Sequence, residues 1–394
     1  MQIKLNPHFA KLQENYLFSE IAARVRAYTD AHPDADMIRL GIGDVTLPLA
    51  PCVVEAMREA CAELEHRESF RGYPPEQGYA FLREAIAAHY VDLGAALSPE
   101  EIFVSDGAKS DAGNLVELFG NNPVFIPDPV YPAYLDANIM AGRRVRFLHG
   151  TADNGFLPSP DRLPCRPCLI YLCSPNNPTG AVYDSAGLAV WVAFAQKSGS
   201  LLLFDAAYEA FVCDGKPRSI FCIEGARSCA IEICSLSKSA GFTGVRCAWT
   251  VIPHALKVGG QSLAALFARR QAAKFNGVSY PVQRGAEAAL SAEGKRESQR
   301  RIAYYRENAR ALAALFSRHG LFYTGGESSP YLWLRCPDGL SSWAFFDLLL
   351  QKIQVIGTPG VGFGAGGEGY FRLTAFSSAE KTAEAIARLE GLLA

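Results

Sequence analysis

A lysine between hydroxyl side chains is the feature of this sequence that most clearly points to chemistry. Lys238 follows Ser235 and Ser237, and Arg246 comes eight positions after it, behind two glycines. A lysine amine can form a Schiff base with an aldehyde, and hydroxyls and a guanidinium are suited to binding a phosphate. The stretch therefore suits a phosphorylated aldehyde. The alternative is a solvated lysine in a Ser/Gly-rich loop, and the rest of the chain has to distinguish the two.

The composition limits the class of protein. A length of 394 residues is enough for two domains and a large core. The 49% hydrophobic and 20% charged residues are typical of a soluble globular protein, and the net charge of −2 leaves no basic excess for nucleic acid. The first residues contain no apolar secretory segment, and no apolar run approaches the ~20 residues of a membrane span. We therefore expect no nucleic-acid partner and no membrane.

The 11 cysteines are scattered along the chain. Cys165 and Cys168 form the single C-x-x-C pair, with no second pair or histidine cluster to complete a zinc site. We therefore predict no metal and a reduced, cytoplasmic protein.

Three apolar segments of strand length end at polar side chains. Residues 169–173 precede Asn177, residues 201–204 precede Asp205 and Tyr208, and residues 231–234 precede Lys238. Apolar runs that alternate with helices predict a mostly parallel α/β sheet, covered on both faces. Ligands bind such sheets outside the carboxyl ends of the strands. These four side chains are therefore expected to share one edge and one site.

Pyridoxal phosphate would account for this set. Besides Lys238, the cofactor needs a carboxylate that keeps its pyridine nitrogen protonated, and Asp205 fits that need. Asn177 and Tyr208 are available for the ring hydroxyl. Tyr131, held among three prolines beyond another strand end, is the candidate to stack on the ring.

The phosphate and the substrate carboxylate need further donors. A strand at residues 102–104 turns through Gly107, Ala108 and Lys109 into a helix, and the free N–H groups of a helix N-terminus bind phosphate. Ser235, Ser237 and Arg246 add to them. Arg372 is the candidate for the α-carboxylate of an amino-acid substrate.

The pattern predicts two domains. The N-terminal arm, residues 1–47, is assigned to the smaller domain, residues 48–285 to a large cofactor-binding domain, and residues 286–394 to a small C-terminal α+β domain. Residues 256–320 are predicted to form long helices with a break at 274–277. The glycine-rich segment 360–369 is predicted to be a mobile loop and not a phosphate loop, because no Lys-Ser/Thr follows it.

These motifs resemble those of the class I/II aminotransferases, pyridoxal-phosphate enzymes of fold type I. The resemblance covers the lysine stretch and residues 176–180 and 205–208, with Cys247 as a mild departure. Five segments narrow it to the LL-diaminopimelate aminotransferase family: residues 16–21, 38–44, 72–78, 105–109 and 238–246. Pro75 and Ser110 depart from the commonest residues of that family.

The resemblance implies a role for each matching position. Lys238, Asp205 and Tyr208 would be catalytic. The implied cofactor-binding residues are Tyr73, Ala108, Lys109, Tyr131, Asn177, Asp205, Tyr208, Ser235, Ser237, Lys238, Arg246 and Asn276. The implied substrate-binding residues are Tyr16, Gly43, Glu76, Lys109, Tyr131, Asn177, Asn276 and Arg372. Three of them, Tyr73, Glu76 and Asn276, would cross from a partner subunit, so the implied active unit is a homodimer.

The implied reaction interconverts LL-2,6-diaminopimelate plus 2-oxoglutarate and tetrahydrodipicolinate plus glutamate, a step of lysine and peptidoglycan-precursor biosynthesis. Diaminopimelate carries a second ammonium and a second carboxylate, which Glu76 and Lys109 could pair. Three alternatives remain open on sequence: a broader aminotransferase of aromatic, alanine or aspartate type, a pyridoxal-phosphate lyase, and a ligand-sensing domain of a regulator.

Overall fold

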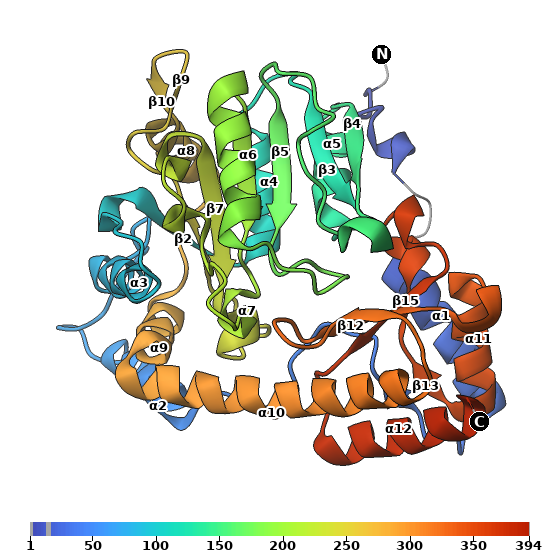
Figure 1. The fold of residues 1–394 in the computed structure, drawn as a ribbon. Helices are drawn as coiled ribbons and strands as arrows, with labels where there is room; N and C mark the ends of the chain where they lie inside the picture. Colours follow the sequence, from blue (N-terminus) through green and yellow to red (C-terminus); the bar gives the residue numbers. More distant parts are fainter. Residues whose placement is uncertain (1–2, 13–16, 394) are drawn as a thin grey trace.

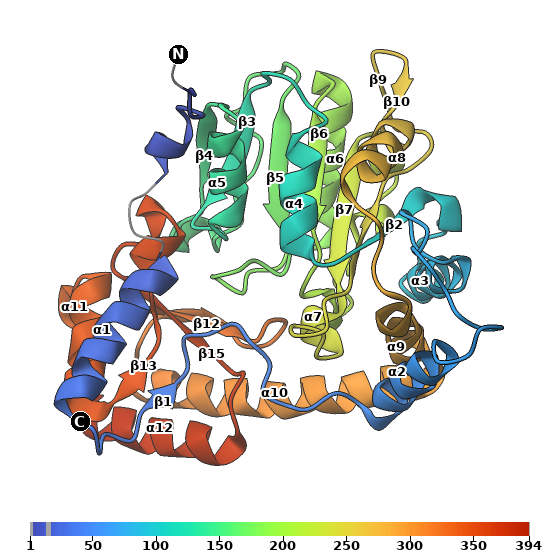
Figure 2. The ribbon, with the colours of Figure 1, turned by 180° about the vertical axis from the view of Figure 1, so that it is seen from behind.

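The computed structural model describes residues 3–12 and 17–393 (Figure 1). A large sheet with helices on both faces lies above a smaller sheet with its own helices (Figures 1 and 2). The expected division into large and small parts is thus visible in the arrangement of the sheets. The proposed boundaries at 47/48 and 285/286 stay a prediction.

The large sheet has seven strands in the order β2-β8-β7-β6-β5-β3-β4. Only β8 runs antiparallel to its neighbours, so the sheet is mostly parallel, as predicted. All strands except the edge strand β4 are buried along their whole length, which explains their continuous apolar sequences. The strands are β2 Ile102–Ser105, β3 Val124–Asp128, β4 Val145–His149, β5 Leu169–Cys173, β6 Leu201–Asp205, β7 Ala230–Ser235 and β8 Ala248–Val251.

Side chains that alternate along the strands bury two separate cores. On β7, Ile231 and Ile233 pack on one face of the sheet, whereas Ala230 and Cys234 pack on the other. Helices α4 and α5 cover the first face and α6 the second (Figures 1 and 2). The helices of this part are α2 Pro51–Glu63, α3 Ala80–Asp92, α4 Ala108–Val116, α5 Ala133–Met140, α6 Ser185–Ser198, α7 Leu236–Ser239, α8 Leu263–Lys274 and α9 Tyr280–Leu290.

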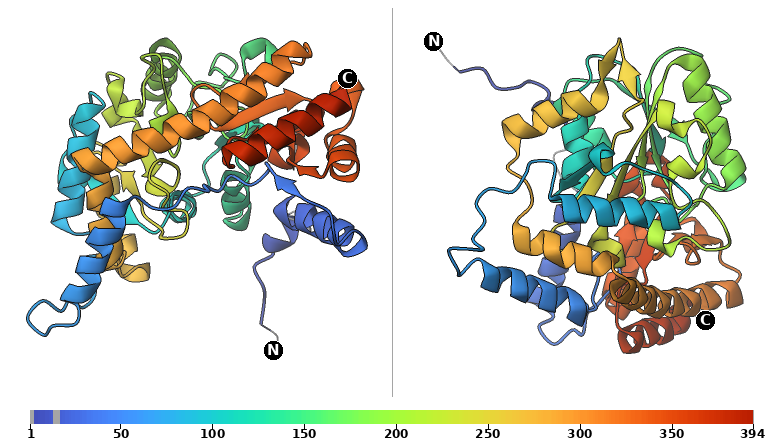
Figure 3. Two further views of the ribbon diagram at one scale, coloured as in Figure 1. Left: turned by 90° about the horizontal axis from the view of Figure 1, so that it is seen from below. Right: turned by 90° about the vertical axis from the view of Figure 1, so that its left-hand side faces the viewer.

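The smaller sheet is antiparallel, in the order β11-β12-β15-β14. The longest helix, α10, passes beneath both sheets, with α12 alongside it (Figure 3). The elements are α10 Ala292–Arg318, β11 Tyr323–Gly325, β12 Tyr331–Arg335, α11 Ser342–Ile353, β13 Val355–Ile356, β14 Thr358–Pro359, β15 Tyr370–Thr374 and α12 Ala379–Leu393.

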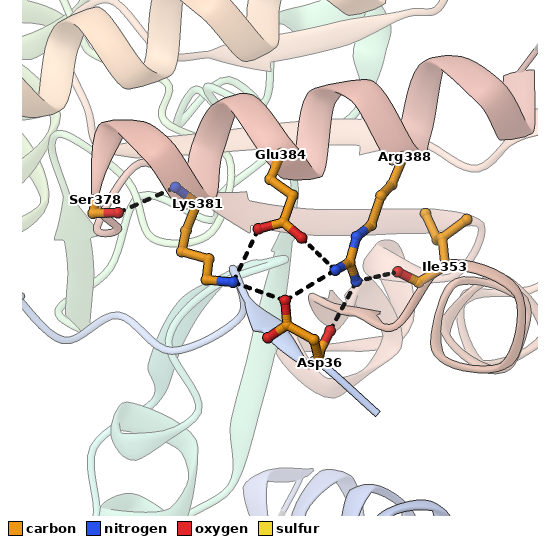
Figure 4. Close-up of polar contacts among 6 residues, drawn as sticks. All are labelled: Asp36, Ile353, Ser378, Lys381, Glu384 and Arg388. Carbon is orange, nitrogen blue, oxygen red and sulfur yellow. Dashed lines mark hydrogen bonds and ion pairs between the residues drawn. The ribbon is translucent and has the colours of Figure 1, made fainter. Parts of the chain in front are cut away.

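The N-terminal arm packs on this smaller part. Helix α1, Leu17–Ala31, contacts α11, and strand β1, Ile38–Arg39, pairs in parallel with β13 (Figure 2). Asp36 lies between α1 and β1 in the sequence. Its carboxylate accepts hydrogen bonds from two residues of α12, Lys381 at 2.8 Å and Arg388 at 3.1 Å (Figure 4). Bonding to Lys381 lowers the pKa of Asp36. Exposed ion pairs add little stability singly, but this network fixes where the arm meets α12.

Two sequence predictions were wrong in detail. The predicted helix at residue 256 begins only at Leu263, because Gly259 and Gly260 take positive φ and turn a short hairpin, β9 Lys257–Val258 and β10 Gln261–Ser262. The segment 360–369 is packed instead of loose. It forms two 3-10 turns, and the Asp128 carboxylate accepts from the N–H of Gly366 at 3.0 Å.

Within the described ranges, no helix combines the length and the apolar character needed to cross a bilayer. The same ranges hold no group of three or more His, Cys, Asp or Glu side chains placed to bind a metal ion.

Candidate active site

A cavity of about 450 Å³ lies at the carboxyl ends of the large sheet, facing the smaller one. It collects most of the predicted site residues from both parts of the chain. Those that line it are Gly43, Ala108, Lys109, Tyr131, Asn177, Asp205, Tyr208, Ser235, Ser237, Lys238, Arg246 and Arg372. The cavity therefore lies at the strand ends, where the sequence predicted that these side chains would meet.

Lys238 is positioned by a short helix that starts directly after β7. Ser235 ends β7 and caps α7, its hydroxyl accepting from the Ser237 N–H at 2.9 Å. The Lys238 ammonium donates to the carbonyl of Gly43. Burial lowers the pKa of Lys238 to about 8, with Asp44 opposing the shift and the positive charge of Arg372 adding to it. An appreciable fraction of the amine is therefore neutral near pH 7 and able to act as a nucleophile.

Asp205 ends the neighbouring strand β6 and is buried. One carboxylate oxygen accepts from the Ala207 N–H at 2.9 Å, and the other accepts from the hydroxyl of Tyr134. Burial raises the pKa of Asp205. A cation placed against this carboxylate, such as a protonated ring nitrogen, would reverse that effect. Tyr134 was missed from the sequence, although it lies only three residues after Tyr131.

The predicted phosphate site holds a matching set of donors. Gly107 precedes α4, and a Cβ at this position would overlap the Arg246 guanidinium, so glycine is needed for the arginine to approach the helix N-terminus. Ala108 and Lys109 at the start of α4, Ser235, Ser237 and Arg246 all line the cavity, and the first N–H groups of a helix are free to bind a phosphate. Paired donors and positive charge are what a phosphate group requires.

Arg372 lies in the middle of β15 and is only 1% exposed. Its guanidinium donates to the side-chain oxygen of Asn177 and to the carbonyl of Gly41, both at 2.6 Å. The guanidinium carbon lies 4.4 Å from the ring centre of Tyr331 and 4.7 Å from that of Phe363. No carboxylate of the described chain pairs with it, and its Nε has no hydrogen-bond partner there. A buried cation of this kind is suited to the carboxylate of a substrate.

Three predicted site residues lie away from the cavity, on the surface. Tyr73 is 87% exposed, and Glu76 and Asn276 are also exposed. The two segments that carry them touch, because a Cβ at Gly277 would contact the carbonyl oxygen of Pro75. The segment between α2 and α3 projects from the body of the molecule (Figure 3). The prediction for Tyr16 lies outside the described residues.

Comparison with known proteins places the chain in a family. Residues 35–389 match the family Aminotransferase class I and II. An LL-diaminopimelate aminotransferase of Agathobacter rectalis is 49% identical, covering 99% of this chain and all of the relative. The chain belongs to the LL-diaminopimelate aminotransferase family. A Lachnospira eligens relative of the same name is also 49% identical over 99% of this chain.

The solved LL-diaminopimelate aminotransferase of Chlamydomonas reinhardtii superimposes over the whole of both chains, with a TM-score of 0.94 and 40% identity. The predictions of family and of fold type I are confirmed. Class I and II aminotransferases are pyridoxal-phosphate enzymes, so this family member uses the same cofactor. The cavity contains most of the side chains that were predicted to bind this cofactor.

Proposed function

We propose that this aminotransferase converts LL-2,6-diaminopimelate and 2-oxoglutarate to tetrahydrodipicolinate and glutamate, with loss of water on ring closure, and catalyses the reverse. The buried Arg372, which pairs with no carboxylate among the described residues, carries the proposal, because it provides a carboxylate site next to the amine of Lys238. The relatives named for the same substrate support the choice of diaminopimelate.

The chain's own residues hold the cofactor at defined points. Asp205 keeps the ring nitrogen protonated, and Tyr131 covers the ring. Tyr208 and the amide nitrogen of Asn177 bind the ring oxygen, since the Asn177 oxygen is already occupied by Arg372. Ala108, Lys109, Ser235, Ser237 and Arg246 bind the phosphate, joined by Tyr73 and Asn276 of a second copy. When bound, pyridoxal phosphate accepts the amino group and stabilises negative charge at the substrate α-carbon.

Lys238 acts twice. Its amine would hold the cofactor, and the same amine would take the proton from the substrate α-carbon. A pKa of about 8 suits a base that operates near neutral pH. Arg372 meanwhile holds the α-carboxylate and orients the bond to that proton.

The distal end of the substrate meets residues that are far from Lys238 in the sequence. They are Tyr16, Gly43, Glu76, Lys109, Tyr131, Asn177 and Asn276. Glu76 pairs with the distal ammonium and Lys109 with the distal carboxylate, so that neither charge is buried alone. Glu76 and Asn276 lie on adjoining exposed segments, which supports their insertion into the cavity of a partner subunit. The active unit is then a homodimer.

The chain divides into a small and a large domain. Residues 1–47 and 286–394 form the small domain and residues 48–285 the large one, in line with the packing of α1 and β1 against α11 and β13. All 11 cysteines are free, which supports a reducing, cytoplasmic location.

A screen of half-reactions tests the substrate assignment. Single amino acids are added to the cofactor-loaded enzyme and the visible spectrum is followed. LL-diaminopimelate and glutamate are expected to bleach the band of the lysine-bound cofactor, and 2-oxoglutarate is expected to restore it. Faster conversion by tyrosine or alanine would reject diaminopimelate as the preferred substrate. Failure of the ketoacid to restore the band would favour a lyase.

Replacing Glu76 with glutamine should separate the two amino-group donors. Because the neutral amide leaves the distal ammonium unpaired, kcat/KM for LL-diaminopimelate should fall by about 10²-fold or more, while that for glutamate stays within about threefold. Glu84→Gln, an exposed change on nearby α3, is the matched control. Equal losses for both donors would remove Glu76 from the specificity site.

A further inference from the structure

The hydroxyl of Tyr331 meets the active site from the smaller sheet. Tyr331 begins β12 and is 1% exposed, yet it lines the cavity. Its hydroxyl oxygen lies 2.6 Å from that of Tyr208, and the two rings meet edge to face with centres 5.2 Å apart. No motif in the sequence assigned a role to this residue.

We propose that Tyr331 is a positioning residue that directs the Tyr208 proton toward the ring oxygen of the cofactor while its ring face supports Arg372. The proposal rests on the cofactor site described above and adds a residue to it. One side chain of the smaller sheet would thereby link the group that binds the cofactor with the group that binds the substrate carboxylate.

The number of protons fixes the direction of this hydrogen bond. Each tyrosine hydroxyl has one proton to donate, and burial raises the pKa of both Tyr208 and Tyr331, so both keep it. If Tyr208 donates to the ring oxygen, the bond between the two hydroxyls has to be donated by Tyr331. In the described chain, Tyr208 is the hydrogen-bond partner of the Tyr331 hydroxyl. Donation from Tyr331 polarises Tyr208 and makes it a stronger donor.

The surrounding backbone holds Tyr331 in this place. A Cβ at Gly43 would overlap the Tyr331 hydroxyl, so only glycine at this position leaves room for it. The same Gly43 carbonyl accepts from Lys238. On the other side, the Arg372 guanidinium stacks 4.4 Å from the ring centre of Tyr331, in cation–π range. The hydroxyl of Tyr331 therefore contacts Tyr208, whereas its ring face contacts Arg372.

Loss of the hydroxyl alone should affect the acidity of the lysine-bound cofactor. A weaker Tyr208 donor stabilises the anionic ring oxygen less, so the proton shared with the lysine nitrogen is held more tightly. In Tyr331→Phe, the pH midpoint of the visible absorbance change should therefore rise, by about half a unit. The KM for glutamate should change less than about twofold, because the ring over Arg372 remains.

The test is a spectral pH titration of the cofactor-loaded protein as wild type, Tyr331→Phe, Tyr208→Phe and the double variant. Tyr208→Phe should raise the midpoint more than Tyr331→Phe, and the double variant should match Tyr208→Phe, because Tyr331 acts through Tyr208. Tyr323→Phe is the control. Tyr323 lies on the adjacent strand β11, away from the cavity, and its hydroxyl oxygen is 3.1 Å from that of Ser317. The midpoint of this variant should equal that of wild type.

An unchanged midpoint in Tyr331→Phe, or an equal further rise in the Tyr208→Phe background, would overturn the proposal. Gly43→Ala gives a second route should Tyr331→Phe fold poorly, since the added methyl displaces the hydroxyl and should also raise the midpoint. An unchanged midpoint in that variant would contradict the proposal as well. The titration contains no substrate, so its result does not depend on whether the enzyme turns over diaminopimelate.

Discussion

Replacing Lys238 with alanine should abolish the visible band of the lysine-bound cofactor and lower kcat by at least about 10⁴-fold. Two functions are lost together, because the same amine holds the cofactor and moves the α-proton. Absorbance spectroscopy and steady-state rates measure the two losses separately. Lys274→Ala, on the exposed end of α8, serves as the surface control.

The same lysine sets a pH dependence that can be measured during loading. With a pKa of about 8, lowered chiefly by burial, the neutral fraction of the amine increases up to that pH. The rate at which the cofactor-free protein acquires its visible band should therefore rise with pH and level off above about pH 8.

Retention of both the band and the activity in Lys238→Ala would refute the site.

The second large effect is expected at Asp205. Asp205→Asn keeps the size of the side chain but removes the charge that holds the ring nitrogen protonated, so kcat should fall by about 10²- to 10³-fold. Tyr134→Phe should have a smaller effect in the same direction, because it removes only the hydroxyl that donates to the carboxylate. Asp161→Asn, on the surface, is the control. Wild-type turnover by Asp205→Asn would show that another group protonates the ring.

The site residues that follow β5, β6 and β7 could be predicted from the sequence for a physical reason. Asn177 and Lys238 come shortly after fully buried strands and Asp205 ends one, and parallel strands bring such positions to one edge. The position of Arg372 depends on how the smaller sheet faces the larger one. Its 2.6 Å contact with Asn177 joins residues 195 positions apart, which no local pattern reveals.

The residues that were missed lie inside regular elements. Tyr134 on α5 and Tyr331 on β12 occupy positions where an aromatic side chain is normally part of the core. Only the packing of the elements shows that their hydroxyls point to Asp205 and Tyr208. The hairpin before α8 was missed for a different reason: apolar residues lie on both sides of it, and the positive φ angles of Gly259 and Gly260 that turn the chain are visible only in the structure.

The network between Asp36 and α12 has a consequence for the order of events during synthesis of the chain. All strands of the large sheet are available once Val251 has left the ribosome, but β1 has to wait for β13 and Asp36 for Arg388. The N-terminal arm therefore spends most of translation without its partners. Nascent chains that end before α11 should hold a folded large sheet and an arm open to proteases, and release of the C-terminus should close it.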